Sequence, residues 1–152
     1  MRKMIAEWYR PPSGSLVPQF YCLSQEGDLA SGVTQTLLQL VRESVPPIDS
    51  KIEALVAEAE VGRYTPKNPD LPDWSINNKD VWLTPPMAKP GHIAISNEYT
   101  EDFSVWEGGE AQQFTYAQFR AALKHWREFL ALVEKEGKEN WVGRRYEAEF
   151  PD

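Results

Sequence analysis

The sequence predicts an α+β fold, in which an antiparallel sheet carries about three helices packed on one face. Three observations lead to this fold class. Short β-prone runs lie near both ends of the chain and between residues 81 and 107, apolar residues at helical spacing cover residues 29–59, and a further helical stretch begins at Thr115. We expect the strands of the two ends and the 81–107 meander to form one sheet.

The size and composition are those of a single globular domain over residues 1–152. Six each of Trp, Tyr and Phe argue against disorder, and no run of 18 apolar residues exists that would span a membrane. The chain has one cysteine, and Glu7 and Arg10 interrupt the apolar stretch that a secretory signal would need. We therefore expect a cytoplasmic protein without an internal disulfide.

Both ends of the chain predict strands. Near the N-terminus, the aromatic runs Ile5–Tyr9 and Phe20–Leu23 flank a proline-rich turn. Near the C-terminus, residues 144–150 alternate so that Tyr146, Ala148 and Phe150 share one face, as in a half-buried strand. This last strand is a candidate to pair beside the first one.

Two adjacent helices follow the N-terminal strands. Apolar residues at helical spacing cover 29–45, and Pro46-Pro47 ends that helix. A second helix over 48–59 has Asp49 or Ser50 as its cap and Gly62 as its stop. Together they predict a helical hairpin that covers a sheet.

Residues 63–79 show no apolar period and hold three prolines, which predicts a long loop. Long loops inside a compact domain often bind ligands or partners, although some only pack on themselves. Asp70, Asp73 and Trp74 combine acids with an aromatic side chain there. This loop is therefore the second candidate for a binding surface.

Three short runs downstream, 81–83, 92–95 and 103–106, predict an antiparallel meander. Phe103 and Val105 alternate toward the core, so Trp106 is expected on the opposite face.

The clearest predicted element is the helix that begins after Thr115 and ends at Gly137. Its apolar residues repeat at alternating spacings of three and four, which makes them one buried stripe. The stripe consists of Tyr116, Phe119, Leu123, Trp126, Leu130 and Val133, widened by Ala122 and Phe129. We expect Trp126 to be deeply buried.

The net charge of −7 has the wrong sign for a nucleic-acid binder, and its distribution is uneven. No basic residue lies between Lys89 and Arg120, whereas acids are frequent there. Such a block attracts a basic partner, or it is a solvated face that keeps the protein soluble. The predicted partner-binding residues are Glu98, Tyr99, Glu101, Asp102, Trp106, Glu107 and Glu110.

No catalytic, metal or cofactor motif is recognisable. Cys22, His92 and His125 lack the number and spacing of zinc ligands, and neither a phosphate-binding loop nor a nucleophile elbow occurs. Cys22 lies in an apolar strand and is expected to be an inert core residue, and both histidines are expected to be structural. We therefore expect a protein that is not an enzyme and holds no cofactor. One enzyme alternative remains, in which Glu98, Glu101 and Asp102 near His92 act as acid and base or bind a cation.

The segments His92–Asp102, Phe103–Glu107 and Phe114–Leu130, with the helical pattern F-x-x-x-L-x-x-W-x-x-F-L, resemble the cores of small bacterial immunity proteins. Those proteins neutralise a toxin delivered by a neighbouring cell or by the cell's own secretion system. The resemblance implies a cytosolic inhibitor whose partner is a cognate protein toxin, and an acidic, aromatic face would suit a nuclease toxin with a basic active site. A regulatory or structural adaptor is the alternative, for which an exposed apolar stripe on helix 29–45 would be the sign.

Overall fold

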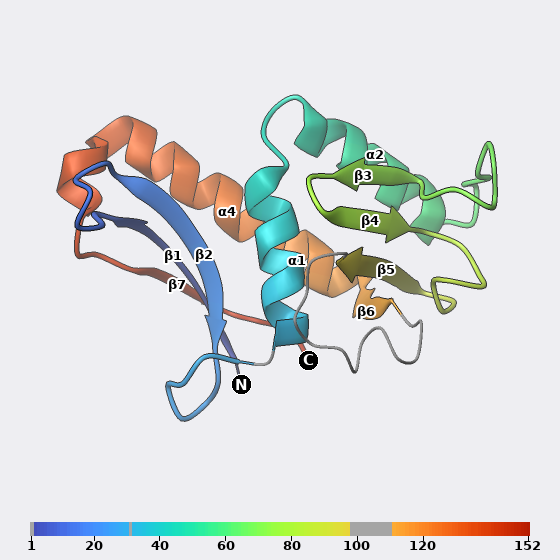
Figure 1. The fold of residues 1–152 in the computed structure, drawn as a ribbon, viewed down its shortest axis with the longest axis horizontal. Helices are drawn as coiled ribbons and strands as arrows, with labels where there is room; N and C mark the ends of the chain where they lie inside the picture. Colours follow the sequence, from blue (N-terminus) through green and yellow to red (C-terminus); the bar gives the residue numbers. More distant parts are fainter. Residues whose placement is uncertain (1, 31, 98–110) are drawn as a thin grey trace. The chain divides into compact units, whose positions relative to one another are not determined.

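The computed structural model describes residues 2–30, 32–97 and 111–152 (Figure 1). The elements in chain order are β1 (Lys3–Tyr9), β2 (Val17–Leu23), α1 (Gly32–Glu43), α2 (Ile48–Glu60), β3 (Trp74–Ile76), β4 (Lys79–Trp82), β5 (His92–Asn97), β6 (Gln112–Thr115), α4 (Tyr116–Glu136), the 3₁₀ helix η1 (Lys138–Trp141) and β7 (Tyr146–Glu149). Separate helices and antiparallel sheets confirm the predicted α+β class. None of the helices in the described part of the chain has the length and apolar character needed to cross a membrane.

The described strands form two antiparallel sheets, so the prediction of one common sheet is wrong. One sheet has the order β2-β1-β7 and the other the order β3-β4-β5-β6. At the outer edge of β2, the Cys22 backbone N–H donates to the side-chain amide oxygen of Gln35 over 3.0 Å, and the amide nitrogen of Gln35 donates to the Cys22 carbonyl over 2.8 Å. A side chain thus occupies backbone groups that a neighbouring strand would need.

The chain divides into two compact units, each with its own sheet. The terminal unit comprises residues 1–42 and 117–152, and the central unit comprises residues 43–116. The sheet β2-β1-β7 and nearly all of α4 belong to the terminal unit, whereas α2 and the sheet β3-β4-β5-β6 belong to the central unit. A single domain over residues 1–152 stays a prediction.

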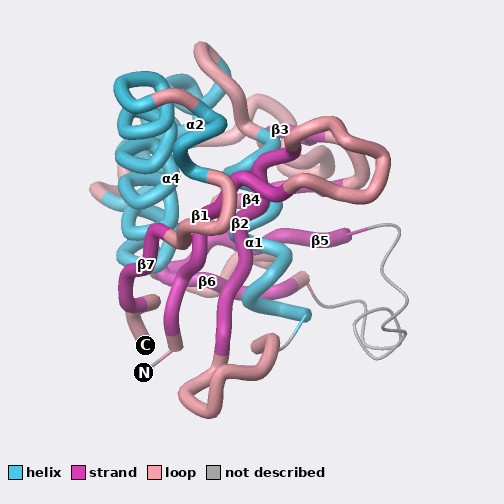
Figure 2. Tube along the Cα trace, turned by 90° about the vertical axis from the view of Figure 1, so that its left-hand side faces the viewer, coloured by secondary structure: helices cyan, strands magenta, loops and turns pink. Residues whose placement is uncertain are grey.

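In the terminal unit, the two ends of the chain form neighbouring strands, as expected. Met4 of β1 pairs with Ala148 of β7 on one side and with Cys22 of β2 on the other, and Figure 2 shows the three strands side by side. One face of this sheet packs against α4, because Phe20 stacks on Trp126 with 5.1 Å between the ring centroids. Trp126 is only 5% exposed, which confirms its predicted burial.

The stripe predicted for α4 is largely confirmed. Its side chains at Phe119, Ala122, Leu123, Trp126, Phe129 and Val133 are buried, and Tyr116 and Leu130 are half-buried. The helix begins directly after Thr115 and ends before Gly137. Gly137 has a φ of 91°, a positive value that glycine adopts readily because it has no Cβ atom. The Gly137 N–H donates to the Val133 carbonyl over 2.7 Å, which closes the last turn.

In the central unit, the prediction of a loop over residues 63–79 is wrong for the C-terminal part of that range. Residues 74–76 form β3, which pairs with β4 so that Ile76 lies opposite Lys79. Asn77 and Asn78 make the two-residue turn, and Asn77 has a positive φ of 53°. Asparagine tolerates this conformation and is favoured in tight hairpin turns, so the hairpin has a local cause in the sequence.

The sheet of the central unit continues through β5 and β6. His92–Asn97 confirms the predicted strand at 92–95, whereas β6 was not predicted. Val81, Ile95 and Gln112 pair across neighbouring strands and are all buried, so they belong to the core face of the sheet. The predicted strand 103–106 lies outside the described residues.

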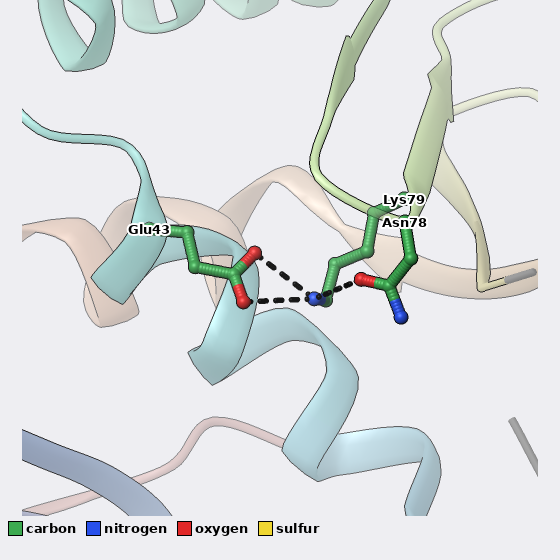
Figure 3. A network of polar contacts seen from close by, with 3 residues as sticks. All are labelled: Glu43, Asn78 and Lys79. Atoms are coloured by element: carbon green, nitrogen blue, oxygen red, sulfur yellow. Dashed lines mark hydrogen bonds and ion pairs between the residues drawn. The ribbon is translucent and has the colours of Figure 1, made fainter. Parts of the chain in front are cut away.

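A buried ion pair lies on the same core face. The ammonium group of Lys79, whose side chain is 2% exposed, lies 3.0 and 3.1 Å from the two carboxylate oxygens of Glu43, which is 18% exposed. It also donates to the side-chain oxygen of Asn78 over 3.1 Å (Figure 3). The charge of Lys79 is thus compensated inside the central unit, as a buried cation requires.

Candidate binding surface of the central unit

The predicted partner-binding residues occupy one connection in the central unit. Glu98, Tyr99, Glu101, Asp102, Trp106, Glu107 and Glu110 lie outside the described residues, so their arrangement stays a prediction. The described residues on both sides define where this connection starts and ends. It joins β5 to the edge strand β6.

The two ends of the connection are held next to one another. Ile95, near the end of β5, pairs with Gln112 at the start of β6. The side-chain amide of the next residue, Gln113, donates to the carbonyls of Met87 and Ala111 over 2.9 and 3.1 Å and accepts from the Lys89 N–H over 3.1 Å. The described residues that flank the acidic segment therefore lie next to one another on a hydrogen-bonded framework.

The negative charge of the chain resides in the central unit. Residues 43–116 contain 13 acidic and 5 basic side chains, which gives a net charge of −8. The terminal unit contains 10 acidic and 11 basic side chains, which gives +1. The unit that carries the predicted surface therefore projects a negative field, whereas the other unit is nearly neutral.

A pocket of about 390 Å³ lies in the same unit, over the part of the predicted loop that is a loop in the structure. It is lined by Leu55, Tyr64, Thr65, Lys67, Asn68, Leu71, Pro72 and Asp73. Leu55 comes from α2, and the other lining residues come from the segment 64–73 that leads into β3. The pocket thus combines apolar walls with one carboxylate and one ammonium group.

Hydrogen bonds fix the polar part of the pocket. The Tyr64 hydroxyl and the Leu83 N–H both donate to the Asp73 carboxylate, the latter over 2.7 Å. Burial, followed by the hydrogen bond to Asp73, raises the pKa of Tyr64 to about 12, so its hydroxyl keeps its proton at neutral pH. The Asp73 N–H also donates to the Val81 carbonyl over 2.8 Å, which holds this residue against β4.

A turn at Asn68 shapes the rim of the pocket. The Asp70 N–H donates to the Asn68 side chain over 3.0 Å, and the Leu71 N–H donates to the Asn68 carbonyl over 3.1 Å. This Asx-type turn is followed by Leu71, which is 58% exposed. The run Asn68-Pro69-Asp70 is the sequence signal for the turn, and a large apolar residue directly after it marks a candidate contact.

The exposure expected of the second predicted surface is found only in part, and its role in binding stays a prediction. Asp70 is exposed, but Asp73 is half-buried and already accepts two hydrogen bonds. Trp74 is half-buried and its indole nitrogen is buried, so it does not offer the exposed aromatic contact expected of it. Tyr64, which the sequence pattern did not single out, and the exposed Leu71 provide the aromatic and apolar surface instead.

The surroundings of Cys22, His125 and His92 are those of structural residues. Cys22 is buried, and burial raises the pKa of its thiol, as expected of an inert core cysteine. His125 is buried and stacks on Tyr146 with 4.5 Å between ring centroids, and its Nε2 lies 2.8 Å from the Tyr146 carbonyl. The Nδ1 of His92 lies 2.9 Å from the Pro90 carbonyl.

In the part of the chain that the structure describes, no group of three or more His, Cys, Asp or Glu side chains is placed to hold a metal ion. Comparison of the chain with protein-family models, with curated protein sequences and with solved structures finds no match.

Proposed function

We propose that this chain is a cytoplasmic protein-binding inhibitor of the immunity-protein kind, which neutralises a cognate toxin with a basic surface. The proposed contact is the acidic, aromatic segment that connects β5 and β6. A toxin that acts on nucleic acid fits this surface, because its active site must itself attract polyanions. An acidic protein that covers such a site excludes the substrate.

One observation carries the proposal: the acidic excess lies in the central unit, which has a net charge of −8, and the segment 98–110 holds five acids and no basic residue. The residues that flank this segment, Ile95 and Gln112, pair in the sheet of that unit. A single-sign field on one part of a protein raises the rate of encounter with an oppositely charged partner. Affinity then comes from aromatic side chains that lose water at the centre of the contact. In the sequence, Tyr99 and Trp106 lie between these acids, and we expect them to serve this role.

The adaptor alternative requires an exposed apolar stripe on helix 29–45. The apolar side chains of α1 that the structure describes, Leu37, Leu38, Leu40 and Val41, are all buried. Leu29 and Val45 are 70% and 57% exposed, but both lie outside α1 and so do not form a stripe on it. This observation does not favour an adaptor that docks through that helix. The carboxylate-based enzyme remains an alternative that the same acidic residues would serve.

The proposal is tested by co-purification with the protein encoded by the gene immediately upstream. Expression of that protein alone is expected to arrest growth, and co-expression of this chain is expected to restore it. The purified pair is expected to form a stoichiometric complex in which the activity of the partner is lost. A partner that is toxic but neither binds this chain nor is inhibited by it would contradict the proposal.

A further inference from the structure

The pocket of the central unit is lined by one carboxylate, that of Asp73. Asp73 is half-buried, and its two hydrogen-bond partners, the Tyr64 hydroxyl and the Leu83 N–H, are both neutral donors. Among the described residues, no cation forms an ion pair with this carboxylate. A carboxylate oxygen that accepts one hydrogen bond retains a second lone pair, so Asp73 can accept from a further donor.

The other lining residues suit a long side chain with an apolar stem. Leu55, Leu71 and Pro72 provide apolar surface, and the Tyr64 ring provides an aromatic face. A guanidinium group is planar, stacks on aromatic rings and binds carboxylates through a fixed fork of donors. An ammonium group offers the same charge but neither the stacking nor the fork, so the pocket fits arginine better than lysine.

We propose that this pocket receives an arginine side chain of the partner protein, with its methylene stem on Leu55 and Leu71 and its guanidinium group at Asp73. The inference rests on the proposed function for the basic character of the partner. It adds a second contact, on described residues, to the one expected at residues 98–110. The pocket itself is testable without the partner.

The positive charge of Lys67 provides a test of which charge the occupant of the pocket carries. It lines the same pocket, is exposed and has no hydrogen bond or ion pair among the described residues. Its ammonium group repels an incoming guanidinium group and would attract an anion. Removal of this charge therefore changes the affinity in opposite directions for a cationic and an anionic occupant.

The probe is capped arginine, N-acetyl-L-arginine amide, titrated into the full chain and followed by NMR of the Leu55 and Leu71 methyl groups and the Tyr64 ring. Capped norleucine and capped glutamate are the matched apolar and anionic probes. For a ligand of this size we expect a Kd on the order of 1 mM for arginine, and at least about fivefold weaker binding of the other two. Equal binding of norleucine, preferred binding of glutamate, or no saturable shift with arginine would overturn the inference.

Three substitutions complete the test. Asp73→Asn removes the charge but keeps an acceptor for the Leu83 N–H, and we expect it to weaken the binding of arginine about tenfold. Lys67→Glu is expected to strengthen the binding of arginine about two- to fivefold. The control is Lys51→Glu, an equal charge change at an exposed position outside the pocket lining, which is expected to leave the affinity within about twofold. Weaker binding after Lys67→Glu would overturn the inference even if Asp73→Asn failed to fold. Failure of these titrations leaves the co-purification result unaffected, so the two proposals fail separately.

Discussion

Trp126 carries the largest single packing contribution that we predict in the terminal unit. It is 5% exposed and lies between the rings of Phe20 and Phe129, at centroid distances of 5.1 and 5.4 Å. Trp126→Ala is expected to lower the free energy of unfolding by about 3–5 kcal/mol, measured by urea denaturation. Lys135→Ala, at an exposed position of the same helix, is expected to change it by less than about 0.5 kcal/mol. A loss under about 1 kcal/mol for Trp126→Ala would contradict its role in the core.

His125 makes the stability of the protein depend on pH. Burial lowers the pKa of His125 in the folded protein below its ordinary value of 6.5, although the hydrogen bond to Tyr146 and the charge of Glu128 oppose this. Between the two pKa values, the unfolded chain binds a proton that the folded chain does not. The contribution of His125 is therefore fully present above pH 6.5 and is lost as the pH falls through the lower pKa of the folded state.

The variant His125→Phe separates this contribution from that of the carboxylates. It keeps an aromatic ring beside Phe20 and Tyr146 but removes the titrating group. We expect the free energy of unfolding to fall less between pH 7 and pH 5 in the variant than in the natural sequence. Because only the pH dependence is compared, a constant loss from the missing hydrogen bond to Tyr146 does not affect the result. Equal pH dependence in both proteins would show that His125 does not titrate as described.

Trp106 is expected to control dissociation of the proposed complex. An aromatic side chain that loses water at the centre of a contact dominates the off-rate, whereas exposed acids mainly set the on-rate. Trp106→Ala is therefore expected to raise the off-rate and to cost about 2 kcal/mol or more of binding, with little change in association. Surface plasmon resonance on the identified partner measures both rates, and an unchanged off-rate would remove Trp106 from the contact.

At the scale of elements, the Lys79–Glu43 pair joins the β3–β4 hairpin to the start of the central unit. Removal of one member of a buried ion pair leaves an uncompensated charge, whereas replacement of both by apolar residues is often neutral. Lys79→Met is expected to destabilise the protein by about 3 kcal/mol, and Lys79→Met with Glu43→Leu is expected to recover most of this loss. Urea denaturation of the four proteins in this cycle gives the coupling energy. Additive losses would mean that the two charges do not stabilise one another.

Local signals in the sequence predicted elements whose apolar pattern is strong, but they missed elements whose signal is polar. The stripe of α4 and the alternation before Phe150 were recognisable because burial repeats at a fixed period. The strand β6 was missed because its buried residues include Gln112, which does not count as apolar. The hairpin at Asn77-Asn78 was missed because the prolines before it indicate a loop, and the loop was extended to residue 79.

The pairing of strands was predictable only where the chain ends meet. β7 pairs with β1 as expected, but the separation into two sheets was not foreseen. Alternation identifies the buried face of a strand and carries no information about which strand lies beside it. The contact between Gln35 and the backbone of Cys22, which occupies part of an edge, joins residues 13 positions apart and has no signature in either local pattern.

For the loop candidate, the sequence singled out the segment that lines the pocket but only some of its side chains. Asp73 was singled out as an exposed acid, yet it is a half-buried acceptor for Tyr64 and Leu83. Tyr64 was overlooked because a lone tyrosine in an irregular segment has no periodicity. Its role depends on the fold, which brings residues nine positions apart into a hydrogen bond.

At the scale of the whole molecule, the two units differ in net charge, and each has its own sheet. The central unit carries −8 and the terminal unit +1, so the long-range field of the protein comes from residues 43–116. A net negative charge also favours solubility, so its magnitude alone does not identify a partner. The position of the acids is the informative quantity, and it is the quantity that charge-reversal variants test.

The most direct test measures the association rate with the identified partner at several ionic strengths, for two double variants of equal net charge. Glu101→Lys with Asp102→Lys reverses charges in the predicted surface, and Glu134→Lys with Glu149→Lys reverses two exposed charges in the terminal unit. We expect the first variant to associate about tenfold or more slowly at low salt and with a flatter salt dependence, and the second to stay within about twofold of the natural sequence. Equal slowing by both variants, or no slowing by the first, would contradict binding through the acidic segment of the central unit.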